Sequence, residues 1–349
     1  MVTAPARPIR VVALTPRGAA LGRRLCPSLK GARCWLPEGR AAPEEQSFQR
    51  LSEVFREAFE AREDLVCIMA AGIVVRGVAP FLTGKDRDPA VVVVDEAGQF
   101  AVSLLSGHLG GANALARRVA RILEGTPVVT TATDVQALPA LDVLAPRLGL
   151  EIQNLAAVRQ IHMTLLQGAP VRLVDPEGYL PGLAVEYPGR FTEESDLDAA
   201  LAAAAVPTVY VGCRERPWPA GWLILRPRNL VAGVGCHKNT PAVEILDFIR
   251  ETFRREGLSL LSLKALATIA ARKEEAGLKE AARELGVEFI WFTAEELAQI
   301  AVPHPSPHPA RHLGVAGVAE AAALRAGAVE LVVPKRKSAN VTLAVARVA

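Results

Sequence analysis

One histidine stands in a glycine-rich run, Ser106-Gly107-His108-Leu109-Gly110-Gly111-Ala112-Asn113. Imidazole is the side chain that changes charge near neutral pH, which suits it to accept a proton. An amphipathic stretch follows the run, so His108 is predicted at a helix start, where the helix dipole disfavours the protonated ring. Glycines weaken a helix turn, so we expect them to let a ligand approach the backbone closely. We therefore predict that His108 is a catalytic base and that its polar and small neighbours bind substrate, namely Ser106, Gly107, Gly110, Gly111 and Asn113.

A second candidate junction follows the apolar run Leu65 to Met69. Small residues such as Gly72 follow that predicted strand, and Arg76 and Lys85 lie shortly beyond it. Arginine and lysine are suited to bind carboxylates. These residues are predicted to bind substrate, although a tight turn with solvated charges explains the stretch equally well.

A third junction is the run Gly233 to Thr240, in which glycines lead into a predicted helix. Such a turn presents backbone amides to an anion. Its spacing fits neither a Walker loop nor a dinucleotide fingerprint. Gly235, Cys236 and Lys238 are predicted to bind substrate. Taken alone, the signal is weak.

Histidines also recur at a spacing of four, at His304, His308 and His312, but prolines between them prevent a helix that would align them. A proline-rich exposed loop explains them better than a metal site does. The five cysteines are scattered and include no CxxC pair, so neither a disulfide framework nor a zinc site is indicated.

Composition limits the partners of this chain of 349 residues. Half of the residues are hydrophobic and the formal net charge is +3, too small an excess to indicate nucleic acid. No apolar run approaches the length of a membrane span, and no signal peptide is apparent. We expect a cytoplasmic protein that binds neither nucleic acid nor membrane.

The elements that must position these residues alternate between strand-like and helix-like patterns. This rhythm predicts an α/β fold of several modules, with mainly parallel sheets flanked by helices. We predict an N-terminal domain over 1–135, a small central domain over 136–227 and a C-terminal domain over 228–349, with a linker at Arg214–Pro219 and Arg226–Pro227. Glu44–Arg62 and Leu263–Ala271 are predicted as helices, and the basic run from Pro334 to Asn340 as a turn between strands.

Several of these runs together resemble the cobalamin synthesis CbiG family. The N-terminal part of the resemblance lies in Ala70 to Arg76, Lys85 to Val91, Leu104 to Asn113 and Val128 to Asp134. The C-terminal part lies in Gly233 to Thr240, Arg272 to Leu278, Gly317 to Ala323 and Lys335 to Ala344. The runs occur in order over roughly residues 60–348, and their combination is specific although no single run is.

The resemblance implies a cobalt-precorrin-5A hydrolase of the anaerobic pathway to vitamin B12. Such an enzyme opens the ring-A δ-lactone and releases the two-carbon bridge unit as acetaldehyde, which gives cobalt-precorrin-5B. A base must activate water, and positive groups must stabilise the oxyanion. From residue type and position, Asp134 and Glu320 are predicted to assist His108 in catalysis, and further substrate contacts are predicted at Thr131, Lys335 and Asn340.

Cobalt would arrive inside the tetrapyrrole substrate, so we expect no separate cofactor and no metal site of the protein's own. Transient contact with other enzymes of the pathway is expected, and the sequence does not fix the oligomeric state. The competing interpretation is a non-catalytic carrier of corrinoid intermediates, because the C-terminal module resembles the separate protein CobE. A nucleotide-dependent oxidoreductase, resting on the weak Gly235 turn, ranks last.

Overall fold

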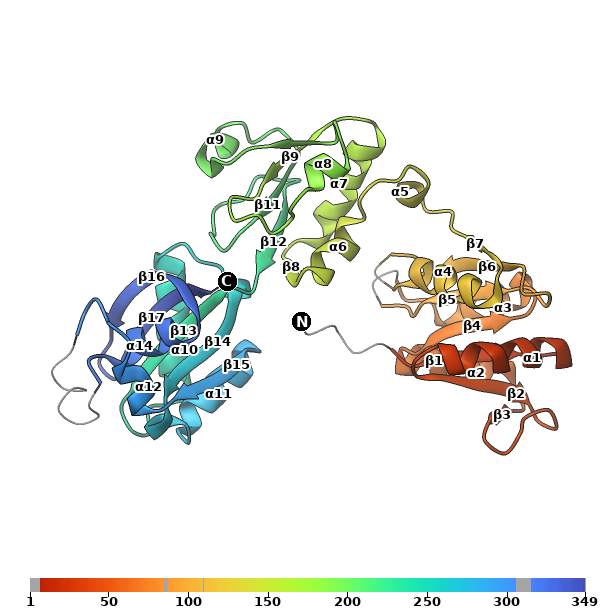
Figure 1. Cartoon of the computed structure of the whole chain (residues 1–349), viewed down its shortest axis with the longest axis horizontal. Helices are drawn as coiled ribbons and strands as arrows, with labels where there is room; N and C mark the ends of the chain where they lie inside the picture. The colour runs from red at the N-terminus through yellow and green to blue at the C-terminus, as the bar shows by residue number, and fades with distance from the viewer. Residues whose placement is uncertain (1–6, 85–86, 109, 306–314, 349) are drawn as a thin grey trace. The chain divides into compact units, whose positions relative to one another are not determined.

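Residues 7–84, 87–108, 110–305 and 315–348 are described by a computed structural model of the chain (Figure 1). Contacts divide the chain into two units, residues 1–147 with 165–168 and residues 148–164 with 169–349. The first unit holds one sheet and the second unit holds two. Helices flank all three mixed sheets, whose strand pairs are mainly parallel when taken together, so the predicted α/β fold is confirmed. The division into three domains stays a prediction.

The first unit is built on a seven-stranded sheet in the order β3-β2-β1-β4-β5-β6-β7. Its strands are β1 (Ile9–Ala13), β2 (Ala32–Pro37), β3 (Gln46–Phe48), β4 (Asp64–Ile68), β5 (Val91–Val94), β6 (Phe100–Leu105) and β7 (Thr126–Val128). Its helices are α1 (Pro16–Leu25), α2 (Leu51–Ala61), α3 (Ala71–Val78), α4 (Ala112–Leu123), α5 (Ala132–Val135) and α6 (Leu141–Arg147).

Alternation along β1 explains how helices cover both faces of this sheet. Val11 packs in a core with side chains of α1 and α4, whereas its neighbour Val12 packs in a second core with α2 and α3. Successive side chains of a strand point to opposite faces, so a strand covered on both faces is apolar throughout. The predicted helix over Glu44–Arg62 is partly wrong, because Gln46–Phe48 pairs with β2 as β3 before α2 begins.

The direction of β6 decides which loops meet at one edge. Strands β1 to β5 are parallel, but β6 is antiparallel to β5, and Leu105 at the end of β6 pairs with Val91 at the start of β5. β7 is parallel to β6. The loops after β6 and β7 therefore lie at the end of the sheet where β5 begins. The loop that leads from β4 into α3 lies at the opposite end of the strands.

The second unit begins with a five-stranded sheet in the order β10-β9-β11-β12-β8. Its elements are β8 (Leu150–Ile152), α7 (Leu155–Leu166), β9 (Val171–Val174), α8 (Leu183–Glu186), β10 (Phe191–Glu193), α9 (Leu197–Ala202), β11 (Thr208–Val211) and β12 (Leu223–Pro227).

A further five-stranded sheet of this unit has the order β15-β14-β13-β17-β16. Its elements are β13 (Leu230–Cys236), α10 (Ala242–Arg255), β14 (Leu263–Ile269), α11 (Ala276–Leu285), β15 (Glu288–Phe292), α12 (Ala294–Ala298), α14 (Val318–Arg325), β16 (Ala328–Lys337) and β17 (Val341–Val348). Helices α10 and α11 pack on one face, and α12 and α14 on the other.

Two sequence predictions in this unit are wrong. Leu263–Ile269 is the interior strand β14 rather than a helix, because burial between β13 and β15 outweighs the helix preference of its leucine and alanine residues. The basic run that was predicted as a turn belongs largely to β16, which extends to Lys337, and the turn is confined to the residues between Lys337 and Val341.

The predicted linker at Arg214–Pro219 is attached to the rest of the second unit. Glu215 N donates to Gly257 O at 2.8 Å, and Ser259 N donates to Cys213 O at 2.8 Å. The side chain of Arg226 is fully buried beneath this stretch. Its guanidinium donates to four acceptors, which are Gly212 O, Arg214 O, Gln153 Oε1 and Glu215 Oε2.

Candidate functional site

The loop after β6 folds tightly on itself. Ala112 N donates to Ser106 O at 3.1 Å and Asn113 N donates to Gly107 O at 3.0 Å, so the first amides of α4 are already bonded within the loop. Ser106 has a φ of 59°, which is unusual for a residue other than glycine. Its Oγ is buried without a hydrogen-bond partner among the described residues. A strained backbone and an unsatisfied polar atom are features that ligand sites retain.

The glycines of this loop have different structural roles. A Cβ on Gly110 would lie 2.2 Å from Ser106 Cβ, and one on Gly107 would lie 2.7 Å from Asn113 Oδ1. Gly111 has a φ of 89° with nothing within 4 Å of such a Cβ. Gly107 and Gly110 therefore allow close packing, and Gly111 allows a left-handed turn before α4.

We expect Gly110→Ala to lower the free energy of unfolding of the first unit by about 1–3 kcal/mol, because the added methyl group overpacks the loop. Gly111→Asn is the matched control, since asparagine tolerates a positive φ and has room there. Denaturant unfolding of both variants checks this. Equal stability of Gly110→Ala and the wild type would show that the loop accepts the methyl group by opening.

A chain of hydrogen bonds runs from β6 to His108. Ser103 Oγ donates to Asn113 Oδ1 at 2.7 Å, and Asn113 Nδ2 donates to Asp134 Oδ2 at 2.8 Å and to Thr131 Oγ1 at 3.1 Å. His108 Nε2 lies 3.2 Å from the same Asp134 oxygen. The structure thus brings together the predicted residues of this loop with Thr131 and Asp134.

Arg117 and His108 both favour the ionised form of Asp134. Arg117, an exposed residue on α4, donates to Asp134 Oδ1 at 2.5 Å. Burial raises the pKa of Asp134, but Arg117 and His108 outweigh it, so the net pKa lies below the ordinary value of 3.8. Arg117 was not predicted, although its spacing of one helical turn from Asn113 places both residues on one face of α4.

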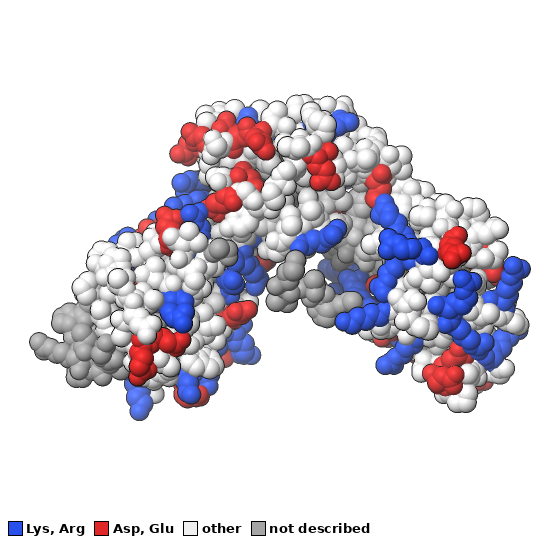
Figure 2. All heavy atoms as spheres, in the orientation of Figure 1, with Lys and Arg blue, Asp and Glu red and all other residues white. Residues whose placement is uncertain are grey.

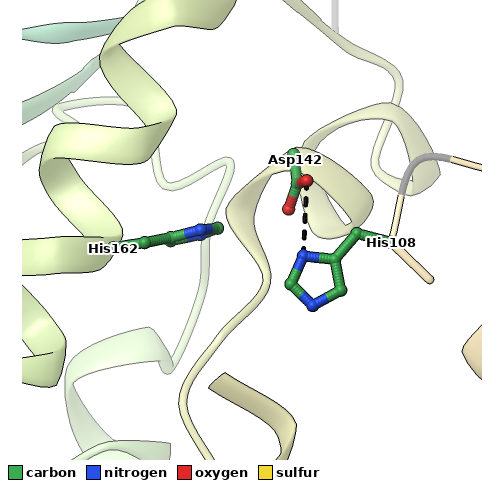
Figure 3. Close-up of side chains that lie close together, drawn as sticks. All are labelled: His108, Asp142 and His162. Atoms are coloured by element: carbon green, nitrogen blue, oxygen red, sulfur yellow. Dashed lines mark ion pairs between the residues drawn. The ribbon is translucent and has the colours of Figure 1, made fainter. Parts of the chain in front are cut away.

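A second carboxylate faces the other ring nitrogen of His108. Figure 3 shows Asp142, a buried residue of α6, with Oδ2 3.5 Å from His108 Nδ1. The third side chain in that view, His162, comes from α7. The sequence carries no pattern around Asp142 that marks it.

The two carboxylates favour the protonated form of His108, whereas the sequence predicted that this form is disfavoured. Its hydrogen bond with Asp142 raises the pKa most, burial lowers it, and Asp134 raises it further, so the net pKa lies above 6.5. Helix α4 begins only at Ala112, so the dipole argument for a neutral ring does not apply at His108. The expected suppression of the protonated form is therefore wrong.

Gly72 and Arg76 lie apart from this network. Gly72 is in the first turn of α3, which is entered from the sheet edge opposite the His108 loop. The exposed Arg76 donates to Gly72 O at 3.1 Å. Lys85 lies outside the described residues. On the face drawn in Figure 2, basic and acidic side chains of this unit are interspersed.

Packing accounts for the glycines of the third junction. Gly233 and Gly235 lie within β13, and a Cβ on Gly233 would lie 1.9 Å from Ala319 O of α14. The amide of Asn239 donates to the Glu275 carboxylate at 2.9 Å, so a side chain already supplies the anion there. Lys238 is exposed, and Cys236 is half-buried.

Glu320 connects three segments of the second unit through hydrogen bonds. This fully buried residue of α14 accepts hydrogen bonds from His304 N at 3.0 Å, His304 Nδ1 at 2.8 Å and Lys335 N at 3.0 Å. Asn340 stands outside this group, donating from Nδ2 to Glu244 Oε2 at 3.1 Å. His308 and His312 lie outside the described residues.

Comparison with known proteins covers nearly the whole chain. Three family models match, described as Cobalamin synthesis G N-terminal over residues 53–134, Cobalamin biosynthesis central region over 139–227 and Cobalamin synthesis G C-terminus over 230–346. The chain belongs to the cobalamin synthesis G family. Within this family's three regions, the His108 loop and Asp134 fall in the first, Asp142 in the second, and Glu320 and Lys335 in the third.

Three curated relatives are similar to this chain over most of their own length. Cobalt-precorrin-5A hydrolase of Priestia megaterium is 34% identical over 350 residues, covering 96% of this chain and 94% of that protein. The protein of the same name from Salmonella typhimurium is 36% identical, covering 86% of each. Protein CobE of Sinorhizobium sp is 34% identical over 122 residues, or 34% of this chain and 79% of CobE.

Histidine and carboxylate side chains also hold transition metals, so the pair His108 and Asp142 offers that chemistry too. The expectation that the protein has no metal site or cofactor of its own stays a prediction. No helix among the described residues is long and apolar enough to cross a bilayer. The site roles assigned from the sequence remain predictions.

Proposed function

We propose that this chain is a cobalt-precorrin-5A hydrolase that opens the ring-A δ-lactone and releases acetaldehyde. The observation that carries the proposal is similarity over 96% of the chain to a relative of that name. The His108 loop lies within residues 53–134, which match the N-terminal family model. The substrate is a cobalt tetrapyrrole. The cytoplasmic location and contacts with other pathway enzymes stay predictions.

In the first step, we assign His108 as the base. Its Nε2 leaves Asp134, which keeps Arg117 as a partner, and takes a proton from water that attacks the lactone carbonyl. The imidazolium that forms is stabilised by Asp134 and Asp142, one at each ring nitrogen. Ring opening then gives a carboxylate and a free secondary hydroxyl. The buried Ser106 Oγ lies in the same loop and is suited to hydrogen-bond the substrate.

In the second step, the hydroxyl loses its proton and the adjacent carbon–carbon bond breaks. Acetaldehyde leaves, and the bonding electrons pass to the metallated macrocycle, which then takes up a proton. The same imidazole serves here as proton acceptor once the first step has returned it to the neutral form.

Anaerobic incubation of the purified protein with cobalt-precorrin-5A tests the proposal. We expect acetaldehyde and cobalt-precorrin-5B in equal amounts, each measured by mass spectrometry, with heat-inactivated protein as the blank. Tight binding of the substrate without acetaldehyde would instead identify a carrier of corrinoid intermediates.

Charge removal tests the predicted carboxylate contacts. We expect Arg76→Ala and Lys238→Ala each to weaken substrate binding about tenfold, because a charge-assisted hydrogen bond contributes about 1.5–3 kcal/mol. Equilibrium titration measures the affinity. Arg254→Ala is the control, since that arginine is exposed and paired only with Glu251 among the described ion pairs. If neither variant differs from this control, Arg76 and Lys238 are ordinary surface charges.

A further inference from the structure

The Glu320 carboxylate is built into the second unit as an acceptor. Its side chain is fully buried, and its three described hydrogen-bond donors are two backbone amides and one imidazole nitrogen. Glu320 is therefore an anion that the protein has already satisfied, rather than one free to react with substrate.

The histidine that Glu320 holds is presented to solvent. The side chain of His304 is 56% exposed, although its Nδ1 is fixed 2.8 Å from the buried carboxylate. An ionised carboxylate accepts a hydrogen bond, so Nδ1 carries the proton and Nε2 carries the lone pair. The hydrogen bond from His304 N to the same carboxylate fixes the backbone as well. The result is an oriented imidazole with a donor nitrogen on its exposed side.

This arrangement is typical of histidines that bind metals. A metal-binding histidine almost always donates its other ring N–H to a carboxylate or carbonyl, which sets the tautomer and increases the basicity of the ligating nitrogen. The proposed substrate brings its own cobalt. The ring nitrogens of a tetrapyrrole occupy the equatorial positions of that metal, so a protein ligand can reach it only along the axis.

The charges around His304 suit an anionic macrocycle. Lys335 Nζ donates to His304 O, which places an ammonium group next to the backbone of His304. Lys337 is exposed two residues further along β16. Arg336 pairs with Glu256, so its charge is already partly committed. Peripheral carboxylates of a bound tetrapyrrole would meet these groups.

We propose that His304 Nε2 binds the cobalt of the substrate as an axial ligand, and that Glu320 is its positioning residue. The inference rests on the proposed function only in that the substrate carries cobalt. A proton-transfer role at His304 is not required, because the first unit supplies a histidine base for the proposed reaction.

Electron paramagnetic resonance of the full chain with cob(II)yrinic acid tests the ligand directly. This probe is a carboxylated cobalt corrin without a nucleotide base, so it has no axial nitrogen of its own. We expect the wild-type complex to show nitrogen superhyperfine splitting on the cobalt lines. His304→Gln keeps an amide that can donate to Glu320, and we expect it to lose the splitting and to bind about tenfold more weakly. Glu320→Gln should keep the splitting but weaken binding by about 10–100-fold.

Other outcomes overturn the proposal. Absence of splitting in the wild-type complex, or splitting that persists in His304→Gln, excludes His304 as the ligand. Loss of splitting in His237→Ala with retention in His304→Gln would assign the other described histidine of this part of the chain. Circular dichroism and thermal unfolding of each variant establish that it is folded.

The acetaldehyde assay separates this inference from the proposed function. A wild-type protein that forms acetaldehyde but shows no splitting disproves the axial ligand and leaves the hydrolase intact. A protein that shows splitting lost in His304→Gln, yet forms no acetaldehyde, supports the ligand and disproves the hydrolase.

Discussion

His108→Ala is expected to fold normally and to lower turnover of cobalt-precorrin-5A by about 10²–10⁴-fold, the usual contribution of a general base. The variant removes the only group assigned to take a proton from the attacking water. It also leaves Asp134 in place with its partner Arg117, so the loop keeps most of its hydrogen bonds. Single-turnover acetaldehyde formation measures the loss.

The pH dependence of turnover checks the base assignment independently. A base must be unprotonated, and the carboxylates at both nitrogens raise the pKa of His108 above 6.5. Turnover should therefore rise with pH through a midpoint above 6.5. Asp142→Asn removes the largest cause of the raised pKa and should move that midpoint to lower pH. A turnover that falls over the same range would make His108 an acid.

Stability should show the opposite trend. Because the folded pKa of His108 is raised, its pairing stabilises the fold fully below the unfolded pKa of about 6.5 and is lost as pH rises through the folded value. The difference in unfolding free energy between wild type and His108→Ala should thus shrink with increasing pH.

For the turnover prediction, near-wild-type turnover by the folded His108→Ala variant would exclude His108 as the base.

Arg226→Ala is expected to destabilise the second unit by about 2–5 kcal/mol, the cost of leaving two carbonyls without their donor. The change leaves the carbonyls of Gly212 and Arg214 without their donor and removes the partner of Glu215. The guanidinium also lies 5.2 Å from the ring centre of Trp218, so aromatic packing is lost with it. Urea unfolding followed by tryptophan fluorescence measures the effect.

Arg228→Ala is the matched control for that experiment. Arg228 is nearly adjacent in sequence, but its side chain is 48% exposed and pairs with Glu151 at the surface, a contact that contributes about 0–1 kcal/mol. Similar losses in both variants would contradict the view that the buried guanidinium of Arg226 holds Gln153 and Glu215 together.

The sequence predicted which segments form strands and helices better than it predicted the directions of the strands. The glycine-rich loop indicated close packing around His108, and the apolar runs indicated buried strands. The reversal at β6 was missed, although the connection between Val94 and Phe100 is far too short for a parallel crossover. Strand β14 was missed because leucine and alanine favour a helix until neighbours on both sides bury the segment.

Side-chain partners were the least predictable part of the site. Asp134 was within reach of prediction, since it ends a run that resembles the family. Asp142 was not, because an isolated acidic residue at the start of a short helix has no spacing that links it to a histidine 34 residues earlier. The sequence predicted a catalytic role for Glu320 because it does not show the partners of that carboxylate. Only the fold shows that two backbone amides and the His304 ring already hydrogen-bond its oxygens.

The reversal of β6 has a consequence for how this site is inherited. Because β6 and β7 leave the sheet at the same edge, the network from Ser103 to Asp142 comes from one uninterrupted stretch of chain. Short connections close at little entropic cost, so the groups can assemble locally before the distant parts of the fold. A recombination event that moved this single stretch would carry the whole network with it, and changes elsewhere in the chain leave its members in register.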